Sequence, residues 1–463
     1  MSTVTISDTP FVGNDRLLVG IVLSVLTFWL FAQSVINVVP AMKSSLDISL
    51  ETLTLAVSLS ALFSGCFVVA SGGLADKFGR MRMTTLGLGL SIVGSAMLVV
   101  AQGPGLFLAG RVLQGLSAAC IMPATLALIK TWYEGRARQR AVSFWVIGSW
   151  GGSGLCSFVG GAIATGLGWR WIFVFSIAVA LLALFLLRGT PESRSASASQ
   201  HKLDVGGLLS LIAALVLVNL FISKGHGWGW SSPLSLTMLV GALAAGAVFI
   251  RNGMRKGEAA LIDFALFRNR AYGAAVLSNF LLNGAIGTMM IASIWLQQGH
   301  HLTPLESGMM TLGYLVTVLA MIRVGEKLLQ RYGARLPMMA GPVLTAIAIA
   351  LISCTFLEKA LYIGVVFASN VLFGLGLGCY ATPSTDTAVA NAPENKIGVA
   401  SGIYKMGSSL GGAMGIAVTA SLFALFLPLG MAHAAQYALW FNAVLCLGAM
   451  AVSALLLPRA SHS

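Results

Sequence analysis

Charged residues are scarce in this chain of 463 residues: Asp, Glu, Lys and Arg together make up 9% of it. Soluble domains carry about 25% charged residues, so the composition excludes an ordinary soluble protein and a disordered chain. The six cysteines all lie in apolar runs and none forms a CxxC pair, which argues against a disulfide scaffold or a metal site. The chain also lacks a Walker A sequence, so ATP-driven transport by this chain is excluded.

Apolar sequence is abundant instead: 57% of the residues are hydrophobic and the mean hydropathy is +0.88. One transmembrane helix needs roughly 20 apolar residues, so this total is enough for about a dozen spans. We predict an all-α membrane protein with fourteen transmembrane helices. The predicted helices cover 17–40, 53–75, 84–101, 105–130, 141–164, 169–187, 203–222, 233–251, 272–296, 307–325, 336–356, 360–386, 398–423 and 433–458.

Lys and Arg residues predict the orientation of these helices. With the N-terminus inside, 22 of the 28 Lys and Arg residues fall in inner segments and 4 in outer loops. Cytoplasmic loops of membrane proteins carry this excess, so both termini are predicted to be cytoplasmic. The same excess accounts for the net charge of +13 without a nucleic-acid partner.

A short internal repeat indicates how the helices are grouped. Leu74-Ala75-Asp76-Lys77-Phe78-Gly79 and Leu328-Leu329-Gln330-Arg331-Tyr332-Gly333 share a Leu, a basic residue, an aromatic residue and a Gly at an offset of 254. Each segment follows the second helix of a six-helix block, an arrangement typical of transporters built from two repeats. We therefore predict a six-helix bundle over 1–190, a linker and two inserted helices over 191–268, and a second six-helix bundle over 269–463.

Three motifs carry a family resemblance. The segment Gly72 to Arg82, GGLADKFGRMR, resembles motif A of the major facilitator superfamily, and Leu108 to Gly115, LAGRVLQG, resembles its motif B. Gly168 to Phe173, GWRWIF, is similar to the start of helix 6 in the fourteen-helix drug:proton antiporters of that superfamily. Further stretches resemble the same antiporters: 28–34, 65–76, 148–154, 380–387 and 402–406.

The resemblance implies a major facilitator fold and proton-driven export of small amphipathic, often cationic drugs. It also implies a multi-pass protein of the bacterial inner membrane that functions as a monomer in the lipid bilayer. The proton gradient would supply the energy, without a cofactor, a metal or a nucleotide. No Ser-His-Asp or two-carboxylate arrangement suggests an enzyme.

The chain departs from the antiporters at two points that concern proton coupling. Their helix 1 carries an Asp five residues before an Asn, but the residue five before Asn37 is Ala32. Their helix 5 motif has a Gly-Pro pair ahead of two glycines, whereas here Cys156-Ser157 precede Gly160 and Gly161. Gly152 belongs to the same helix 5 segment. The residue that couples transport to protons therefore has to be sought elsewhere.

Motif A offers a candidate inner gate. Asp76 lies at the end of helix 2, beside Lys77 and Arg80, and could bind a basic side chain of this loop or the N-terminus of a helix across the bundle interface. Gly72 and Gly79 would let the backbone turn or approach closely. The alternative is a plain basic loop, whose charges do no more than set the topology.

Arg111 of motif B is predicted to lie within the membrane, six residues into helix 4. A buried Arg there is costly and usually faces a cavity or binds another polar group, for which Gln114 and Gln33 are suitable. The alternative is a side chain that snorkels to the outer interface.

Asp386 and Lys405 are predicted at similar depths on adjacent helices. They could form a buried ion pair, because each charge would otherwise be unpaired. Asp386 could also be the site that takes up the transported proton, and these two interpretations are compatible. We therefore treat Asp386, Lys405 and Arg111 as candidates for proton coupling.

A central cavity between the bundles would bind the drug. Polar and large apolar side chains are its candidate walls, although packing in a core or against lipid explains each of the apolar ones equally well. The candidates are Gln33, Asn37, Gln114, Trp29, Phe31, Trp145, Trp150 and Met289. Three other functions remain open: a proton symporter, an exporter of a natural metabolite, and a membrane sensor that transports nothing.

Overall fold

The computed structural model describes residues 11–35, 42, 45–46, 50–195, 204–302 and 304–458. Within these ranges the chain forms helices and connecting loops but no strand. The first part comprises α1 (Asp15–Leu26), η1 (Thr27–Phe31), η2 (Ala32–Ser34), α3 (Leu50–Phe78), α4 (Arg80–Val100), α5 (Pro104–Trp132), α6 (Gly135–Val146), η3 (Ile147–Gly151), α7 (Gly152–Gly166) and α8 (Arg170–Leu187).

The second part begins with α9 (Val205–Trp228) and α10 (Pro233–Lys256), followed by the short turns η5 (Gly257–Ala259) and η6 (Phe264–Arg268). It continues with α11 (Arg270–Gly284), α12 (Gly287–Ile294), η7 (Trp295–Gly299), α13 (Pro304–Met309), α14 (Leu312–Tyr332), α15 (Arg335–Ile352), α16 (Lys359–Ala390), η8 (Glu394–Lys396), α17 (Ile397–Phe426), η9 (Leu427–Leu429) and α18 (Met431–Leu456).

The helical membrane architecture is confirmed. Each predicted segment overlaps one or more helices, although not over its whole length: α15, for example, ends at Ile352 inside the predicted segment 336–356, and non-helical breaks fall at 285–286 and 310–311. Eleven helices of the described part are long and apolar enough to cross a membrane, or twelve if the bent pair formed by 135–156 and 158–166 counts as one span. The two remaining predicted spans, 17–40 and 203–222, are not among these helices. The first contains α1, which has 12 residues. The second contains part of α9, of which only the apolar stretch Val205–Val218 is recorded as a shorter apolar helix.

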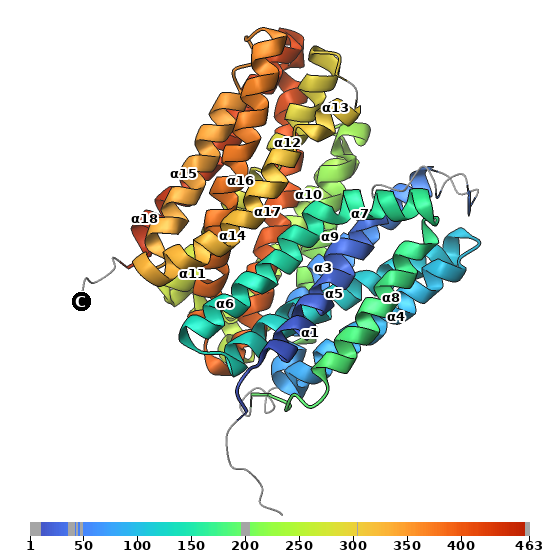
Figure 1. The fold of residues 1–463 in the computed structure, drawn as a ribbon, viewed down its shortest axis with the longest axis vertical. Helices are drawn as coiled ribbons and strands as arrows, with labels where there is room; N and C mark the ends of the chain where they lie inside the picture. The colour runs from blue at the N-terminus through green and yellow to red at the C-terminus, as the bar shows by residue number, and fades with distance from the viewer. Residues whose placement is uncertain are drawn as a thin grey trace, which may run out of the picture.

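The helices form two bundles (Figure 1). We call α1–α8 the N-terminal bundle and α11–α18 the C-terminal bundle, and the surface between them the interface. Across the interface α3 and α5 pack against α17, while α6 packs against α14 and α16. The inserted helix α9 packs along α10 and also touches α3 and α17. Large apolar side chains of α10 stay exposed, including those of Val240 and Leu243, as expected of a helix in contact with lipid.

Two features recur in the two bundles, and the first of them lies at the positions that the internal repeat predicts. Gly79 and Gly333 each follow the second helix of a bundle, and both have positive φ angles, of 124° and 75°. This backbone conformation favours glycine, which explains the Gly in both segments. The first span of each bundle also contains a π-helical turn, η1 in one and η7 in the other, and a third such turn, η3, interrupts the fifth span. Such turns occur frequently at functional sites.

Candidate functional site at the inner end of the interface

Backbone contact between α3 and α17 brings the two bundles together at one end of the interface. A Cβ atom added at Gly72 would lie 2.2 Å from the carbonyl oxygen of Gly398, and one added at Gly398 would lie 2.3 Å from that of Gly72. Gly402 approaches the Val68 carbonyl oxygen in the same way, at 2.8 Å. These distances leave no room for a side chain, so the helices can meet here only because glycine occupies all three positions.

Asp76 lies next to this contact and binds the N-terminus of α17. Its Oδ1 accepts a hydrogen bond from the Gly398 N–H at 2.9 Å, and its Oδ2 accepts one from the Val399 N–H at 3.1 Å. A helix N-terminus favours a negative charge, so the position stabilises the ionised carboxylate. Arg80 also binds Oδ1, at 3.1 Å. Both contacts that the sequence offered as alternatives for Asp76 are therefore present.

Two basic side chains of the N-terminal bundle bind the C-terminal end of α16 and the turn that follows it. Arg80 donates to the Glu394 carbonyl oxygen at 3.0 Å and to Thr131 Oγ1 at 2.7 Å. Lys130 donates to the carbonyl oxygens of Ala390 and Ala392. Helix C-termini favour positive charge, so these contacts complement the one that Asp76 makes at the start of α17.

Asp386 also forms a contact across the interface, but its partner differs from the predicted one. Its Oδ1 accepts a hydrogen bond from Arg138 Nε of α6 at 2.9 Å, and the two side chains are 5% and 21% exposed. The predicted ion pair with Lys405 is wrong: Lys405 lies against the rings of Trp29 and Trp145. The sequence places Asp386 and Lys405 at similar depths on neighbouring helices. It does not show that Arg138, a basic residue of the other bundle, binds Asp386 instead.

We name these contacts the inner gate. It consists of Asp76, Arg80, Lys130 and Arg138 on the N-terminal bundle, and of Asp386, Ala390, Ala392, Glu394, Gly398 and Val399 on the C-terminal bundle. The arrangement closes one end of the interface by charges placed at helix ends. In the sequence, Lys130 and Arg138 are only two of many basic residues that are predicted to be cytoplasmic, and no pattern distinguishes them from the others.

Glu192 supports the motif A loop and was also missed by the sequence analysis. Its carboxylate accepts hydrogen bonds from the N–H groups of Met81 and Arg82, both at 2.9 Å, and so caps α4. A Cβ atom at Gly79 would lie 2.4 Å from this carboxyl group, which adds a steric reason for glycine there. Lys77 stands over the Phe78 ring at 5.5 Å.

Arg111 is fully buried in the N-terminal bundle, so it does not snorkel to an interface. Its guanidinium donates to the carbonyl oxygens of Ala56 and Ala32 and to Ser60 Oγ, at 3.0, 2.8 and 2.6 Å. It also donates to Gln114 Oε1 at 2.6 Å, as predicted. Gln33, the other predicted partner, has a side chain outside the described part of the structure, and Asn37 lies outside the described residues.

The aromatic candidates occupy different environments. Trp29 in η1 and Trp145 in α6 face Lys405 across the interface, with ring centroids 5.4 and 5.2 Å from its Nζ. Trp150 in η3 is half-buried and packs against the core clusters of both bundles. Phe31 is buried in the core of the N-terminal bundle, so packing accounts for its position. Two of the four rings therefore surround a buried cation.

The helix 5 glycines lie where α7 packs against the first span. A Cβ atom at Gly160 would lie 2.6 Å from Ser34 Cβ, and one at Gly152 would lie 3.1 Å from Trp29 Cβ. Gly161, in contrast, faces open space. Ser34 Oγ donates to the Cys156 carbonyl oxygen at 2.8 Å, so the departure from the usual helix 5 motif falls at this contact.

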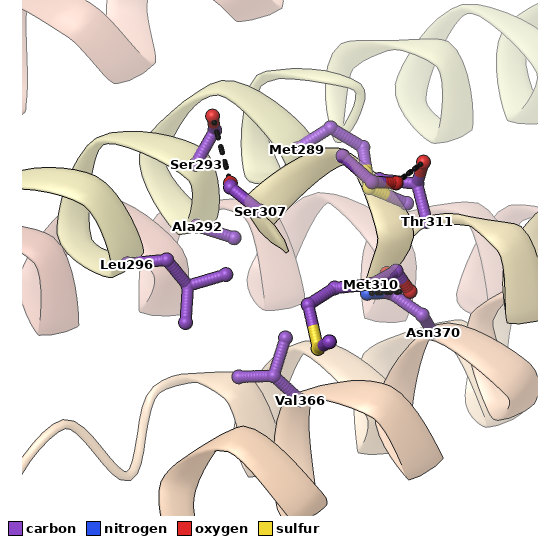
Figure 2. A pocket seen from close by; sticks show the side chains of 10 residues that line it. Met289, Ala292, Ser293, Leu296, Ser307, Met310, Thr311, Val366 and Asn370 are labelled. Carbon is purple, nitrogen blue, oxygen red and sulfur yellow. Dashed lines mark hydrogen bonds between the residues drawn. The ribbon is translucent and has the colours of Figure 1, made fainter. Parts of the chain in front are cut away.

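Met289 lines a cavity formed by residues of the C-terminal bundle. The cavity of about 110 Å³ is lined by residues of α12, η7, α13, the turn between α13 and α14, and α16. The side chains of Leu296, Met310 and Val366 converge on it (Figure 2). Asn370 donates to the Met310 carbonyl oxygen at 2.9 Å at its edge.

A second ion pair holds the turn between α16 and α17 from the side of the C-terminal bundle. Asp263, outside the predicted spans, accepts hydrogen bonds from Lys396 Nζ at 2.6 Å and from the Ala265 N–H at 2.9 Å. Burial by itself would raise the pKa of Asp263, but the two hydrogen bonds and the charge of Lys396 outweigh it and lower the pKa below its ordinary 3.8. Among the described residues, no group of three or more His, Cys, Asp or Glu side chains could hold a metal ion.

Comparison with known proteins finds relatives that are similar in sequence and in fold. The quinolone resistance protein NorB of Staphylococcus aureus, strains MRSA252 and MW2, is 51% identical over 454 residues, which are 98% of this chain and 98% of the relative. The fold is similar to that of the proton:xylose symporter XylE, with a TM-score of 0.68, 15% identity and 96% of each chain covered. It is also similar to the human organic anion transporter MFSD10, with a TM-score of 0.62, 17% identity, and 95% and 98% of the two chains covered.

The family resemblance of the motifs is confirmed on the level of the whole chain. The family model described as Major Facilitator Superfamily matches residues 17–256 and 271–463, so the match leaves out only the N-terminal residues and the short connection before α11. The protein with this apolar, two-bundle architecture is a multi-pass membrane protein, and it belongs to the major facilitator superfamily.

Proposed function

We propose that the chain is a proton-driven multidrug efflux antiporter of the bacterial inner membrane. It exports amphipathic drugs, quinolones among them, by alternating access, and the proton gradient supplies the energy without a bound cofactor. The proposal is supported by the 51% identity to proteins named for quinolone resistance. It is also supported by the major facilitator family of the chain, whose structural relatives include transporters.

The proposed topology has fourteen spans with both termini in the cytoplasm, in a protein that works as a monomer. Two six-helix units over 1–190 and 269–463 flank a linker and two inserted helices over 191–268. The contacts of the inner gate support this topology, because they join the predicted cytoplasmic ends of α3, α5, α6, α16 and α17. A wrong span count would bring outer and inner loops together instead.

The inner gate is the observation that carries the transport proposal. It closes the cytoplasmic end of the interface with contacts that can break and reform, since a charge at a helix end is worth about 0.3–2 kcal/mol. Several such contacts together stabilise the closed gate, yet a change at one of them can shift the equilibrium between the closed and the open gate. A sensor or scaffold without a transport cycle would not need reversible contacts between the bundles.

Asp386 is the proposed proton site of this gate. The Asp76 carboxylate is held in its charged form by two backbone N–H groups and by Arg80. In the described structure Asp386 has one hydrogen-bonding partner, Arg138. A proton that reaches Asp386 from the outer side removes the charge that holds Arg138, which loosens the gate and favours the inward-facing state. Loss of that proton to the cytoplasm restores the contact after the drug has bound.

Everted membrane vesicles with an acidic interior test this function. We expect uphill uptake of norfloxacin into vesicles that contain the chain, together with proton release from the interior; tetracycline and tetraphenylphosphonium are tested alongside it. Asp386→Asn serves as the matched variant and should retain downhill movement while losing uphill uptake. Proton and drug movement in the same direction would indicate a symporter, and movement of neither drug nor protons would indicate a sensor; either result would overturn the proposal.

A further inference from the structure

Lys405 of α17 is a buried cation to which the described part of the structure supplies no counter-ion. Its side chain reaches across the interface, where its Nζ lies 5.4 Å from the ring centroid of Trp29 and 5.2 Å from that of Trp145. The residue is 8% exposed. In the ranges that the structure describes, Lys405 forms no ion pair, and the gate acids Asp76 and Asp386 are bound to arginines.

The two rings are held in place by their own hydrogen bonds. Trp145 Nε1 donates to Thr125 Oγ1 at 2.9 Å, and Trp29 Nε1 contacts Met122 Sδ at 3.3 Å. Their faces stay available to Lys405, and the attraction between a cation and a ring replaces part of the lost hydration. It supplies no negative charge, however, and a buried ammonium is stabilised best by an anion with which it can pair.

A second buried cation, Arg111, also lacks an acidic partner among the described residues. Arg111 is likewise fully buried, and each of its hydrogen bonds goes to a neutral group. The carboxylates of Asp76 and Asp386 bind Arg80 and Arg138, and neither forms an ion pair with Lys405 in the described part of the structure. The described interface therefore carries a positive charge where two aromatic faces meet, an environment that attracts an aromatic acid and repels a second cation.

From this geometry we propose that Lys405 binds the carboxylate of the exported drug, while Trp29 and Trp145 bind its aromatic rings. The inference rests on the proposed drug export and narrows its substrates to aromatic amphiphiles that carry an acidic group, zwitterions included. When such a drug binds, its carboxylate draws the ammonium away from the indole rings, and the vacated faces stack on the drug. Permanent cations without a carboxylate would compete with Lys405 for the same rings and bind more weakly.

A matched pair of ligands tests this assignment: norfloxacin and its ethyl ester, which has the same rings and amine but no carboxylate. Binding to the purified, detergent-solubilised chain is measured by tryptophan quenching, and transport of both is measured in proteoliposomes. For the unmodified chain we expect an affinity for the acid about tenfold higher than for the ester. Lys405→Gln should abolish this preference by weakening binding of the acid alone, whereas Lys405→Arg should keep it.

Lys359→Gln is the matched control, because Lys359 is an exposed lysine on α16. It should leave the preference for the acid unchanged. Equal affinity of the unmodified chain for acid and ester, or no binding of either, overturns the proposal, and this measurement needs no variant that might misfold. An equal loss for both ligands in Lys405→Gln overturns it as well. Selective binding of the acid without transport would instead support the role of Lys405 and refute the export function.

Discussion

The glycine contact between α3 and α17 allows a sharp test of the inner gate. In the change Gly72→Ala the new methyl group would lie 2.2 Å from the Gly398 carbonyl oxygen. The adjacent change Gly73→Ala adds the same methyl group to the same helix, but its nearest neighbour is Val399 Cγ2 at an ordinary 3.5 Å. Because both changes improve the helix propensity of α3 by about 1 kcal/mol, they differ only in the contact across the interface.

The size of the effect follows from this distance. An ordinary carbon–oxygen contact needs more than about 3 Å, so α3 and α17 must separate by about 1 Å before the added methyl group fits. Overpacking of this kind costs about 1–3 kcal/mol. The cost falls only on the state in which the gate is closed, so Gly72→Ala should shift the equilibrium toward the inward-open state by about five- to 150-fold.

Pulsed electron paramagnetic resonance can measure this shift. Spin labels on exposed residues of the two bundles, Ala137→Cys in α6 and Lys327→Cys in α14, report the distance across the predicted cytoplasmic end in a background without the six native cysteines. We expect Gly72→Ala to populate a longer distance and Gly73→Ala to resemble the unmodified chain. Identical distance distributions for the two variants would refute the steric reasoning, as would a longer distance in Gly73→Ala alone.

Changes at the polar contacts of the inner gate, and at the ion pair of Asp263, should alter export or stability. Asp76→Asn should lower norfloxacin export about tenfold by weakening the closed gate, with little change of affinity in detergent; a large loss of affinity would contradict this. Arg138→Gln and Asp386→Asn should each lower the melting temperature more than the double change, since an unpaired buried charge costs about 3–5 kcal/mol. The low pKa of Asp263 means that its ion pair stabilises the fold at pH 5–8 and loses this contribution below the ordinary pKa of 3.8. The destabilisation by Asp263→Asn should therefore be constant at pH 5–8 and vanish in acid; a loss already at pH 6 would refute the assignment.

Patterns confined to one stretch of chain predicted the structure well. Apolar runs located the helices, and the segments ending at Gly79 and Gly333 revealed the repeat. The motif A pattern indicated a contact between Asp76 and a helix N-terminus, because that chemistry depends on charge and position alone. Arg111 and Gln114 could be paired because they lie three residues apart on one helix.

Contacts between distant helices could not be predicted in the same way. Asp386 binds Arg138, a residue 248 positions away, and the choice between Arg138 and Lys405 depends on how the bundles dock. The sequence predicts the depth of each helix but not the rotation of the helix about its axis. The same uncertainty in rotation applies to Met289, which lines a pocket made of residues of its own bundle. Its place in the central cavity stays a prediction.

Proteoliposomes that contain only the purified chain test directly whether protonation at the inner gate drives drug export. Norfloxacin and lumenal pH are followed together after an inside-acid gradient is imposed. We expect norfloxacin to accumulate against its gradient while protons leave, and Asp386→Asn to abolish the accumulation. Uphill accumulation with an unchanged pH dependence in Asp386→Asn would show that the proton binds elsewhere, and the absence of drug-linked proton flux in the unmodified chain would contradict antiport itself.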